Sequence, residues 1–304
     1  MRQIKRMIIL GASGLIGGQL LKDYRSDGIE TIATYHRNPE DGLSRFDLLE
    51  DDLFDLVPDL GPGDWVCVLS AEVDPNRVAD DPDAARALNV DATLRAMETA
   101  RDHGAGILFL STESVFDGIT GDYGETDPPR PLFAYARQKA EVENELKTGG
   151  GKWLIVRTGW TVGWNPKARC PVAGTYKALL SGSAVMAEDN LFTLTDVADT
   201  SRALLELLRA DAVGIYHVAA NPPIGRAQLA QIILETSSFG AQMSFKPGKF
   251  SEIPFAEPRP AQAWVSNAKF MDQFGTRFTP PEDTVRKKIA LLDAGQQKAQ
   301  RITA

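Results

Sequence analysis

The chain is poor in cysteine, in histidine and in long apolar runs. Two cysteines, Cys67 and Cys170, occur in 304 residues, so no disulfide framework is expected and a reducing cytoplasm is favoured. The three histidines, His36, His103 and His217, are too scattered to predict a metal site. No run approaches the roughly 20 apolar residues of a membrane span, and the first ten residues lack a signal-peptide pattern.

Positive charge is also scarce. The chain has 33 basic and 41 acidic side chains, a net charge of −8, whereas nucleic-acid binders usually carry a basic surface. The composition, 43% hydrophobic and 24% charged, is that of an ordinary globular protein. The expected partner is therefore a small molecule, with neither nucleic acid nor membrane, and a homodimer is the commonest assembly for such a chain.

Short apolar runs alternate with helical stretches in the first half of the chain. Strands are predicted at residues 7–10, 31–35, 64–69, 106–111 and 153–157, with helices at 15–25, 82–103 and 133–147. This alternation predicts βαβ units, and hence an α/β fold with a Rossmann-type doubly wound parallel sheet.

The pattern loosens after residue 163, which predicts a smaller C-terminal substrate lobe. We expect an NADP-binding Rossmann domain at residues 1–163, to which residues 194–219 return, and a lobe built from 164–193 and 220–304. Within that lobe, residues 163–174 are predicted to form a loop and residues 225–236 a helix.

A glycine-rich stretch follows the first predicted strand and opens the first predicted helix. Gly11 permits a tight turn, Gly14 lets the backbone approach a pyrophosphate, and Gly17 lets the helix pack on the strand. The helix N-terminus offers free N–H groups to phosphate oxygens. The alternative is a glycine-rich turn without a ligand. The candidate cofactor residues are Gly11, Ser13, Gly14, Leu15, Ile16 and Gly17.

The second predicted strand ends without a carboxylate between residues 31 and 38. An NAD site would place Asp or Glu there to bind the ribose 2′-hydroxyl. Arg37 instead has the planar guanidinium that suits a 2′-phosphate, although a solvated surface arginine is the alternative. The predicted cofactor is therefore NADP(H).

Tyr135 and Lys139 stand four residues apart on a predicted helix, so they share one face. A neighbouring ammonium is expected to lower the phenol pKa from its usual value of about 10, so that Tyr135 can exchange a proton with a carbonyl or alcohol. Thr112 ends the strand before this helix and can hold the reacting oxygen. A structural tyrosine and a surface lysine are the alternative, but the order of glycine loop, Thr112 and Tyr-Lys pair favours an oxidoreductase.

These features resemble the extended short-chain dehydrogenases, and within them the dTDP-4-dehydrorhamnose reductase group. The resemblance runs over nearly the whole chain, and its markers are residues 11–17, 111–118, 123–129, 131–139, 157–160, 214–218 and 259–260. The segments Val-Phe-Asp-Gly at 115–118 and Gly-Ile-Tyr-His at 214–217 are the more specific to the reductase group.

The resemblance implies NADPH-dependent reduction of the 4-keto group of a nucleotide-linked deoxysugar. Tyr135 would donate the proton to the keto oxygen, and Thr112 would bind that same oxygen. Lys139 would tune the pKa of Tyr135 and hold the nicotinamide ribose. The resemblance also implies adenine contacts at Asp47 and Leu48, a cofactor lining at Ser70 and Ala71, and substrate contacts at Val73, Glu113, Trp160 and Arg259.

Two departures from the group leave the sugar open. Glu113 and Ser114 stand where the group has Asp and Tyr, and no Asn precedes Ser70 and Ala71. An epimerase or dehydratase of the same superfamily, which keeps NAD⁺ bound, stays an alternative, although Ser114 replaces the second acid a dehydratase needs. A catalytically silent NADP-binding regulator is another, since the regulatory subunit of methionine adenosyltransferase resembles the same group.

Overall fold

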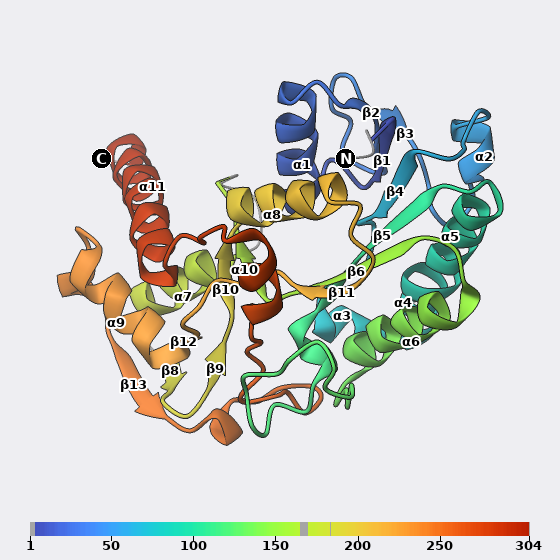
Figure 1. Cartoon of the computed structure of the whole chain (residues 1–304). Helices are drawn as coiled ribbons and strands as arrows, with labels where there is room; N and C mark the ends of the chain where they lie inside the picture. Colours follow the sequence, from blue (N-terminus) through green and yellow to red (C-terminus); the bar gives the residue numbers. More distant parts are fainter. Residues whose placement is uncertain (1–3, 165–169, 183, 304) are drawn as a thin grey trace.

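A computed structural model describes residues 4–164, 170–182 and 184–303. Its main body is a parallel seven-stranded sheet of order β11-β6-β5-β4-β1-β2-β3 (Figure 1). The order reverses between β1 and β4, as in doubly wound folds, so the predicted Rossmann-type α/β fold is confirmed. The strands are β1 (Arg6–Leu10), β2 (Glu30–Tyr35), β3 (Ser44–Arg45), β4 (Asp64–Val68), β5 (Gly106–Thr112), β6 (Trp153–Thr158) and β11 (Gly214–His217).

Side chains of β1 alternate between two apolar cores. Met7 and Ile9 enter the core covered by α1 (Leu15–Ser26) and α8 (Val197–Arg209). Ile8 and Leu10 enter the core covered by α5 (Thr93–Asp102) and α6 (Ala134–Gly149), on the opposite face in Figure 1. Because both faces are buried, the central strands read in the sequence as continuous apolar runs.

The helix predicted at residues 82–103 is one helical stretch of three parts. They are α4 (Pro82–Arg86), the π-helical turn η1 (Ala87–Ala92) and α5. Asn89 in η1 donates to the Gln138 side chain at 2.8 Å and exchanges two hydrogen bonds with the Glu72 backbone. The wide turn therefore connects the loop after β4 to α6. The short helices α2 (Leu53–Leu56) and α3 (Pro75–Asp80) complete this side of the sheet.

A third apolar cluster forms the core of a smaller lobe. Its helices are α7 (Pro171–Leu180), α9 (Arg226–Thr236) and α11 (Pro281–Thr303). Its strands pair as β7 (Trp160–Val162) with β10 (Leu194–Asp196), β9 (Leu191–Phe192) with β12 (Ile224–Gly225), and β8 (Ala184–Ala187) with β13 (Phe245–Gly248). The remaining pieces are η2 (Glu113–Val115), η3 (Gly240–Gln242), η4 (Phe250–Glu252) and α10 (Ala268–Phe274).

The chain returns to the main body through α8 and β11, which pairs with β6. The loop predicted at residues 163–174 is wrong at its end, because α7 begins at Pro171. Proline suits the first position of a helix, where its missing N–H costs no hydrogen bond. Residues 165–169 of that predicted loop lie outside the described residues.

Candidate active site

The glycine loop lies at the point where the strand order reverses. Gly11 has a φ of +97°, and a Cβ on it would lie 2.9 Å from the Ser70 backbone nitrogen. A Cβ on Gly17 would lie 2.5 Å from the Gly11 carbonyl oxygen. Gly14 caps α1 without any side-chain hydrogen bond, so the first N–H groups of the helix are left for a ligand. The fold therefore brings the predicted residues of the loop together with Ser70.

The ends of β2 and β3 form a polar cluster. Parallel pairing sets Arg45 beside Tyr35, two residues from the exposed Arg37. His36 Nε2 lies 3.1 Å from a carboxylate oxygen of Asp47, and the Arg45 guanidinium lies 3.9 Å from the same oxygen. The Arg45 guanidinium also lies 3.9 Å from an Asp51 carboxylate oxygen, so basic and acidic side chains alternate in this cluster near Arg37. Arg45 was not predicted as a site residue, because only the pairing of β2 with β3 brings it there.

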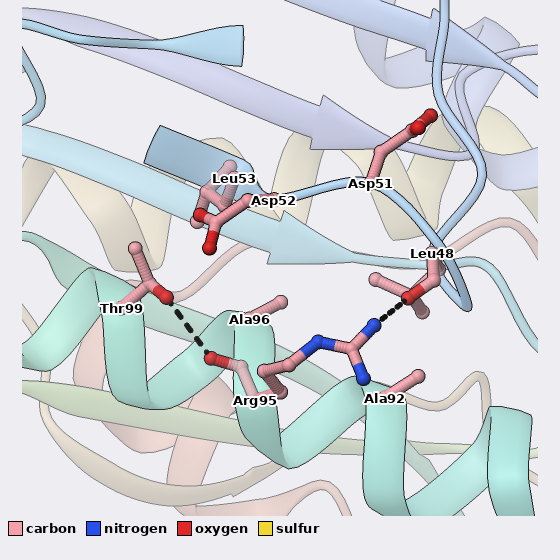
Figure 2. Close-up of a pocket in the computed structure, with 8 residues that line it drawn as sticks. All are labelled: Leu48, Asp51, Asp52, Leu53, Ala92, Arg95, Ala96 and Thr99. Carbon is pink, nitrogen blue, oxygen red and sulfur yellow. Dashed lines mark hydrogen bonds between the residues drawn. The ribbon is translucent and has the colours of Figure 1, made fainter. Parts of the chain in front are cut away.

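The segment predicted to contact adenine is fixed to α5. Arg95 Nη2 donates to the carbonyl oxygens of Leu48 at 2.6 Å and Leu49 at 2.8 Å, as Figure 2 shows for Leu48. The Leu48 side chain is buried in the core, whereas Asp47 is partly exposed. The pocket between this segment and α5 holds about 10 Å³, no more than about one water, so it is a packing gap beneath the loop.

Thr112, Tyr135 and Lys139 lie at the carboxyl edge of the sheet and on the first two turns of α6. Lys139 is buried, and its Nζ donates to the Leu110 carbonyl at 3.0 Å and lies 5.9 Å from the centroid of the Tyr135 ring. The Thr112 hydroxyl oxygen accepts from the Ser114 N–H at 3.1 Å, which leaves its own O–H to donate.

The predicted lowering of the Tyr135 pKa is wrong for this structure. Burial raises the pKa of Tyr135 well above its usual value, because the phenolate would lose its hydration. Burial also lowers the pKa of Lys139 to about 8, against an opposing effect of the Glu143 carboxylate. The phenol is therefore a firmly protonated group, the state that suits a proton donor.

The predicted substrate residues fall into two kinds. Val73, in the loop after β4, is 56% exposed, and Trp160, at the start of β7, is 45% exposed, so both large side chains face open space. Glu113 differs, because it is buried and its carboxylate accepts from the Thr193 backbone N–H at 3.1 Å. Burial raises the pKa of Glu113 to about 7, so near neutral pH a part of it is protonated.

Two arginines from different parts of the lobe approach the same aromatic ring. The guanidinium carbon of Arg259 lies 5.9 Å from the centroid of Phe255, and that of Arg226 lies 6.0 Å from it. Each guanidinium has a buried nitrogen without a hydrogen-bond partner, Nη1 of Arg259 and Nε of Arg226, and burial lowers the pKa of both. Two partly buried guanidinium groups on the same ring are suited to binding an anion.

Arg226 was not predicted as a site residue. The sequence shows only an arginine after Gly225, at the start of a helix, and nothing there indicates that it meets Arg259. Among the described residues, no group of three His, Cys, Asp or Glu side chains is arranged to hold a metal ion. The described helices include none that is long and apolar enough to cross a membrane.

The sheet order, the glycine loop and the Tyr-Lys helix define an extended short-chain dehydrogenase. A family model described as the RmlD substrate binding domain matches residues 5–293, so the chain belongs to that family. This result confirms the resemblance to the dTDP-4-dehydrorhamnose reductase group.

Individual relatives fall into two sets. The chain is 27% identical over 306 residues to dTDP-4-dehydrorhamnose reductase of Sinorhizobium fredii, covering 96% of this chain and 99% of that protein. It is 31% identical over 147 residues to methionine adenosyltransferase 2 subunit beta of Bos taurus, covering 47% of this chain and 42% of that protein. The match thus spans less than half the length of that subunit.

The fold is similar to the crystal structure of dTDP-4-dehydrorhamnose reductase from Bacillus anthracis in complex with NADP. The TM-score is 0.77 at 19% sequence identity, covering 94% of this chain and 99% of that one. At this identity, the similarity establishes the fold alone.

Proposed function

We propose that the protein is an NADPH-dependent reductase that acts on the 4-keto group of a nucleotide-linked deoxysugar. One observation carries the proposal, which is the chain of contacts from Tyr135 through Phe133 to Arg259. The Tyr135 and Phe133 rings lie 6.2 Å apart, and the Arg259 guanidinium lies 4.1 Å from the Phe133 centroid. The phenol of Tyr135 and the guanidinium of Arg259 therefore stand close together, as the reduction of a sugar joined to a diphosphate requires.

The cofactor fits the residues present. Gly11 and Gly17 have no room for a side chain, and the uncapped start of α1 suits a pyrophosphate. Arg37, exposed and without an ion-pair partner among the described residues, would bind the 2′-phosphate. Ser70 and Lys139 would hold the nicotinamide end. When bound, NADPH supplies the hydride that reduces the carbonyl carbon.

The proton comes from Tyr135. Its raised pKa keeps the phenol protonated until the carbonyl oxygen gains charge, and the phenol then donates its proton to that oxygen. The free O–H of Thr112 donates to the same oxygen and holds it in place. The nearby Lys139 ammonium stabilises the phenolate that remains, which is later reprotonated from solvent.

The substrate would lie between the main body and the lobe. Arg226 and Arg259 would bind the diphosphate through the accessible parts of their guanidinium groups, and the exposed Trp160 and Val73 would contact the sugar and nucleotide. In this arrangement the binding energy of the diphosphate orients the ketone toward Tyr135.

The test is oxidation of NADPH in the presence of a panel of keto sugars, each with and without its nucleotide. We expect turnover with one or more nucleotide-linked 4-keto sugars and little with the free sugars. If no member of the panel is reduced by protein that binds NADPH, the reductase proposal fails.

A silent NADP-binding regulator is the second candidate, favoured by the 31% identity to methionine adenosyltransferase 2 subunit beta. It predicts NADPH binding without turnover, and specific binding to a separate catalytic protein. The intact Thr112, Tyr135 and Lys139 favour the reductase. An epimerase is disfavoured because the chain has no carboxylate between residues 31 and 38, where β2 ends. NAD⁺ retained through purification would favour an epimerase.

A further inference from the structure

A fully buried ion pair lies behind the Tyr-Lys helix. Glu143 of α6 and Arg157 of β6 are 0% and 1% exposed, and their side chains form a two-point hydrogen-bonded pair of 2.9 Å and 2.6 Å. The Ser111 hydroxyl donates to the same carboxylate at 2.6 Å. Burying such a pair costs desolvation energy, so stability alone is a weak reason for its presence.

The Glu143 carboxylate joins α6, which carries Tyr135 and Lys139, both to β6 through Arg157 and to β5 through Ser111. Lys139 and Glu143 lie one turn apart on α6, and they bind consecutive residues of β5. Lys139 Nζ donates to the Leu110 carbonyl, and Glu143 accepts from Ser111, the residue before Thr112. The carboxylate therefore controls the position of both the ammonium and the strand end that carries the threonine.

We propose that Glu143, held by Ser111 and Arg157, is a positioning residue that keeps the buried Lys139 ammonium charged and aligned beneath the cofactor site. The side chain of Glu143 is not open to the ligand, so it acts through Lys139 and Ser111. A role of Glu143 in cofactor binding rests on the function proposed above for Lys139. The effect of Glu143 on the charge of Lys139 is independent of that function.

The other groups around Lys139 leave Glu143 as its counterion. Burial raises the pKa of Cys67, on β4, to about 12, so this thiol is neutral. Arg157 is already paired, and burial together with the Arg157 charge lowers the pKa of His217 to about 3, so that imidazole is neutral too. The ionisable groups on the elements packed against α6 are Arg77 and Asp80 of α3, Asp91 of η1, Arg95, Glu98, Arg101 and Asp102 of α5, Glu113 of η2 and Arg157 of β6. The helix α6 itself adds Tyr135, Arg137, Glu141, Glu143, Glu145 and Lys147.

The geometry also gives His217 a place in this cluster. Its Nδ1 lies 3.0 Å from the Ser266 carbonyl, which fixes the proton on that nitrogen, and its Nε2 lies 3.5 Å from Arg157 Nη1. A neutral imidazole that accepts from Arg157 supports the guanidinium without competing for Glu143. The sequence motif Gly-Ile-Tyr-His at 214–217 thus contributes to the same buried network.

The test measures the titration of Lys139 directly, by NMR of the full chain labelled with carbon-13 lysine, in the absence of NADPH. We expect Glu143→Gln to lower the Lys139 midpoint by about one pH unit, the smallest effect of a lost opposite charge within a few ångströms. Glu141→Gln is the matched control, because Glu141 lies on the same helix but pairs with Arg86 at the surface. The control midpoint should equal that of the unchanged protein.

An unchanged midpoint in folded Glu143→Gln would overturn the inference. If that variant does not fold, because Arg157 is left unpaired, the double variant Glu143→Met with Arg157→Met replaces the pair by apolar side chains and is read in the same way. NADPH titrations over the same pH range then separate the two claims. A shifted Lys139 midpoint with no shift in the pH dependence of NADPH affinity would contradict the cofactor role of Lys139 and leave the action of Glu143 intact.

Discussion

Arg259 stacks its guanidinium on Phe133, with its central carbon 4.1 Å from the ring centroid. Phe133 is the residue that caps the N-terminus of α6, so a residue of the lobe contacts the start of the helix that carries Tyr135. Glu257 strengthens the same junction, because its carboxylate accepts from the Ala134 N–H at 3.1 Å and pairs with Arg137 at 2.8 Å. These contacts hold Arg259 at a fixed position relative to the start of the helix that carries Tyr135.

Replacing Arg259 should weaken substrate binding more than it slows chemistry. We expect Arg259→Met to raise KM for a nucleotide sugar by about tenfold to a hundredfold, the loss of one charged hydrogen bond to a phosphate, with a smaller effect on kcat. Steady-state kinetics of NADPH oxidation measure both. Arg86→Met is the control, since this guanidinium is half exposed and pairs with Glu141 at the surface. Equal KM values for the two variants would contradict the anion site.

Removing the phenol should abolish most of the turnover. Tyr135→Phe keeps the ring and its contact with Phe133 but cannot donate a proton, so we expect kcat to fall at least a hundredfold. NADPH affinity, measured by fluorescence, should change little because Lys139 is retained. A variant with undiminished kcat would remove Tyr135 from the mechanism.

Cofactor choice should depend on the basic end of β2. We expect NADPH to bind at least tenfold tighter than NADH, and Arg37→Gln to remove most of that preference by weakening NADPH alone. Fluorescence titration with each cofactor measures the ratio. Arg25→Gln is a suitable control, because Arg25 bonds to Thr31 and Gly42 within the main body. Equal affinities of the unchanged protein for the two cofactors would refute the NADP assignment.

Much of this architecture could be predicted because it depends on local patterns. A glycine loop after an apolar run indicates a phosphate-binding turn, and parallel strands place their carboxyl ends at one edge. The positions of Gly11, Thr112 and Tyr135 on their strand and helix follow from these two rules.

The features that were missed depend on contacts between distant segments. Arg226 and Arg259 are separated by 33 residues, and the fold brings both to the ring of Phe255. Arg45 reaches the end of β2 through a two-residue strand too short to give a pattern. The burial of Tyr135, which raises its pKa against the expected effect of Lys139, is set by the packing of whole elements.

Glu113 offers a test of burial through the pH dependence of stability. Its folded-state pKa of about 7 lies above the unfolded value of 4.5, so the folded state favours the protonated form. The stability this gives is fully present below about pH 4.5 and is lost as pH rises through 7. Glu113→Gln cannot titrate, yet its amide oxygen can still accept from the Thr193 N–H.

As the pH rises from 5 to 8, the free energy of unfolding of the unchanged protein should therefore fall relative to that of Glu113→Gln. We expect this difference to change by on the order of 3 kcal/mol. Thermal or denaturant unfolding at several pH values measures the difference. Glu145→Gln, at an exposed position on α6, is the control and should show a much smaller change. A difference that stays constant with pH would mean that Glu113 has the same pKa in the folded and unfolded states, which would contradict the effect of its burial.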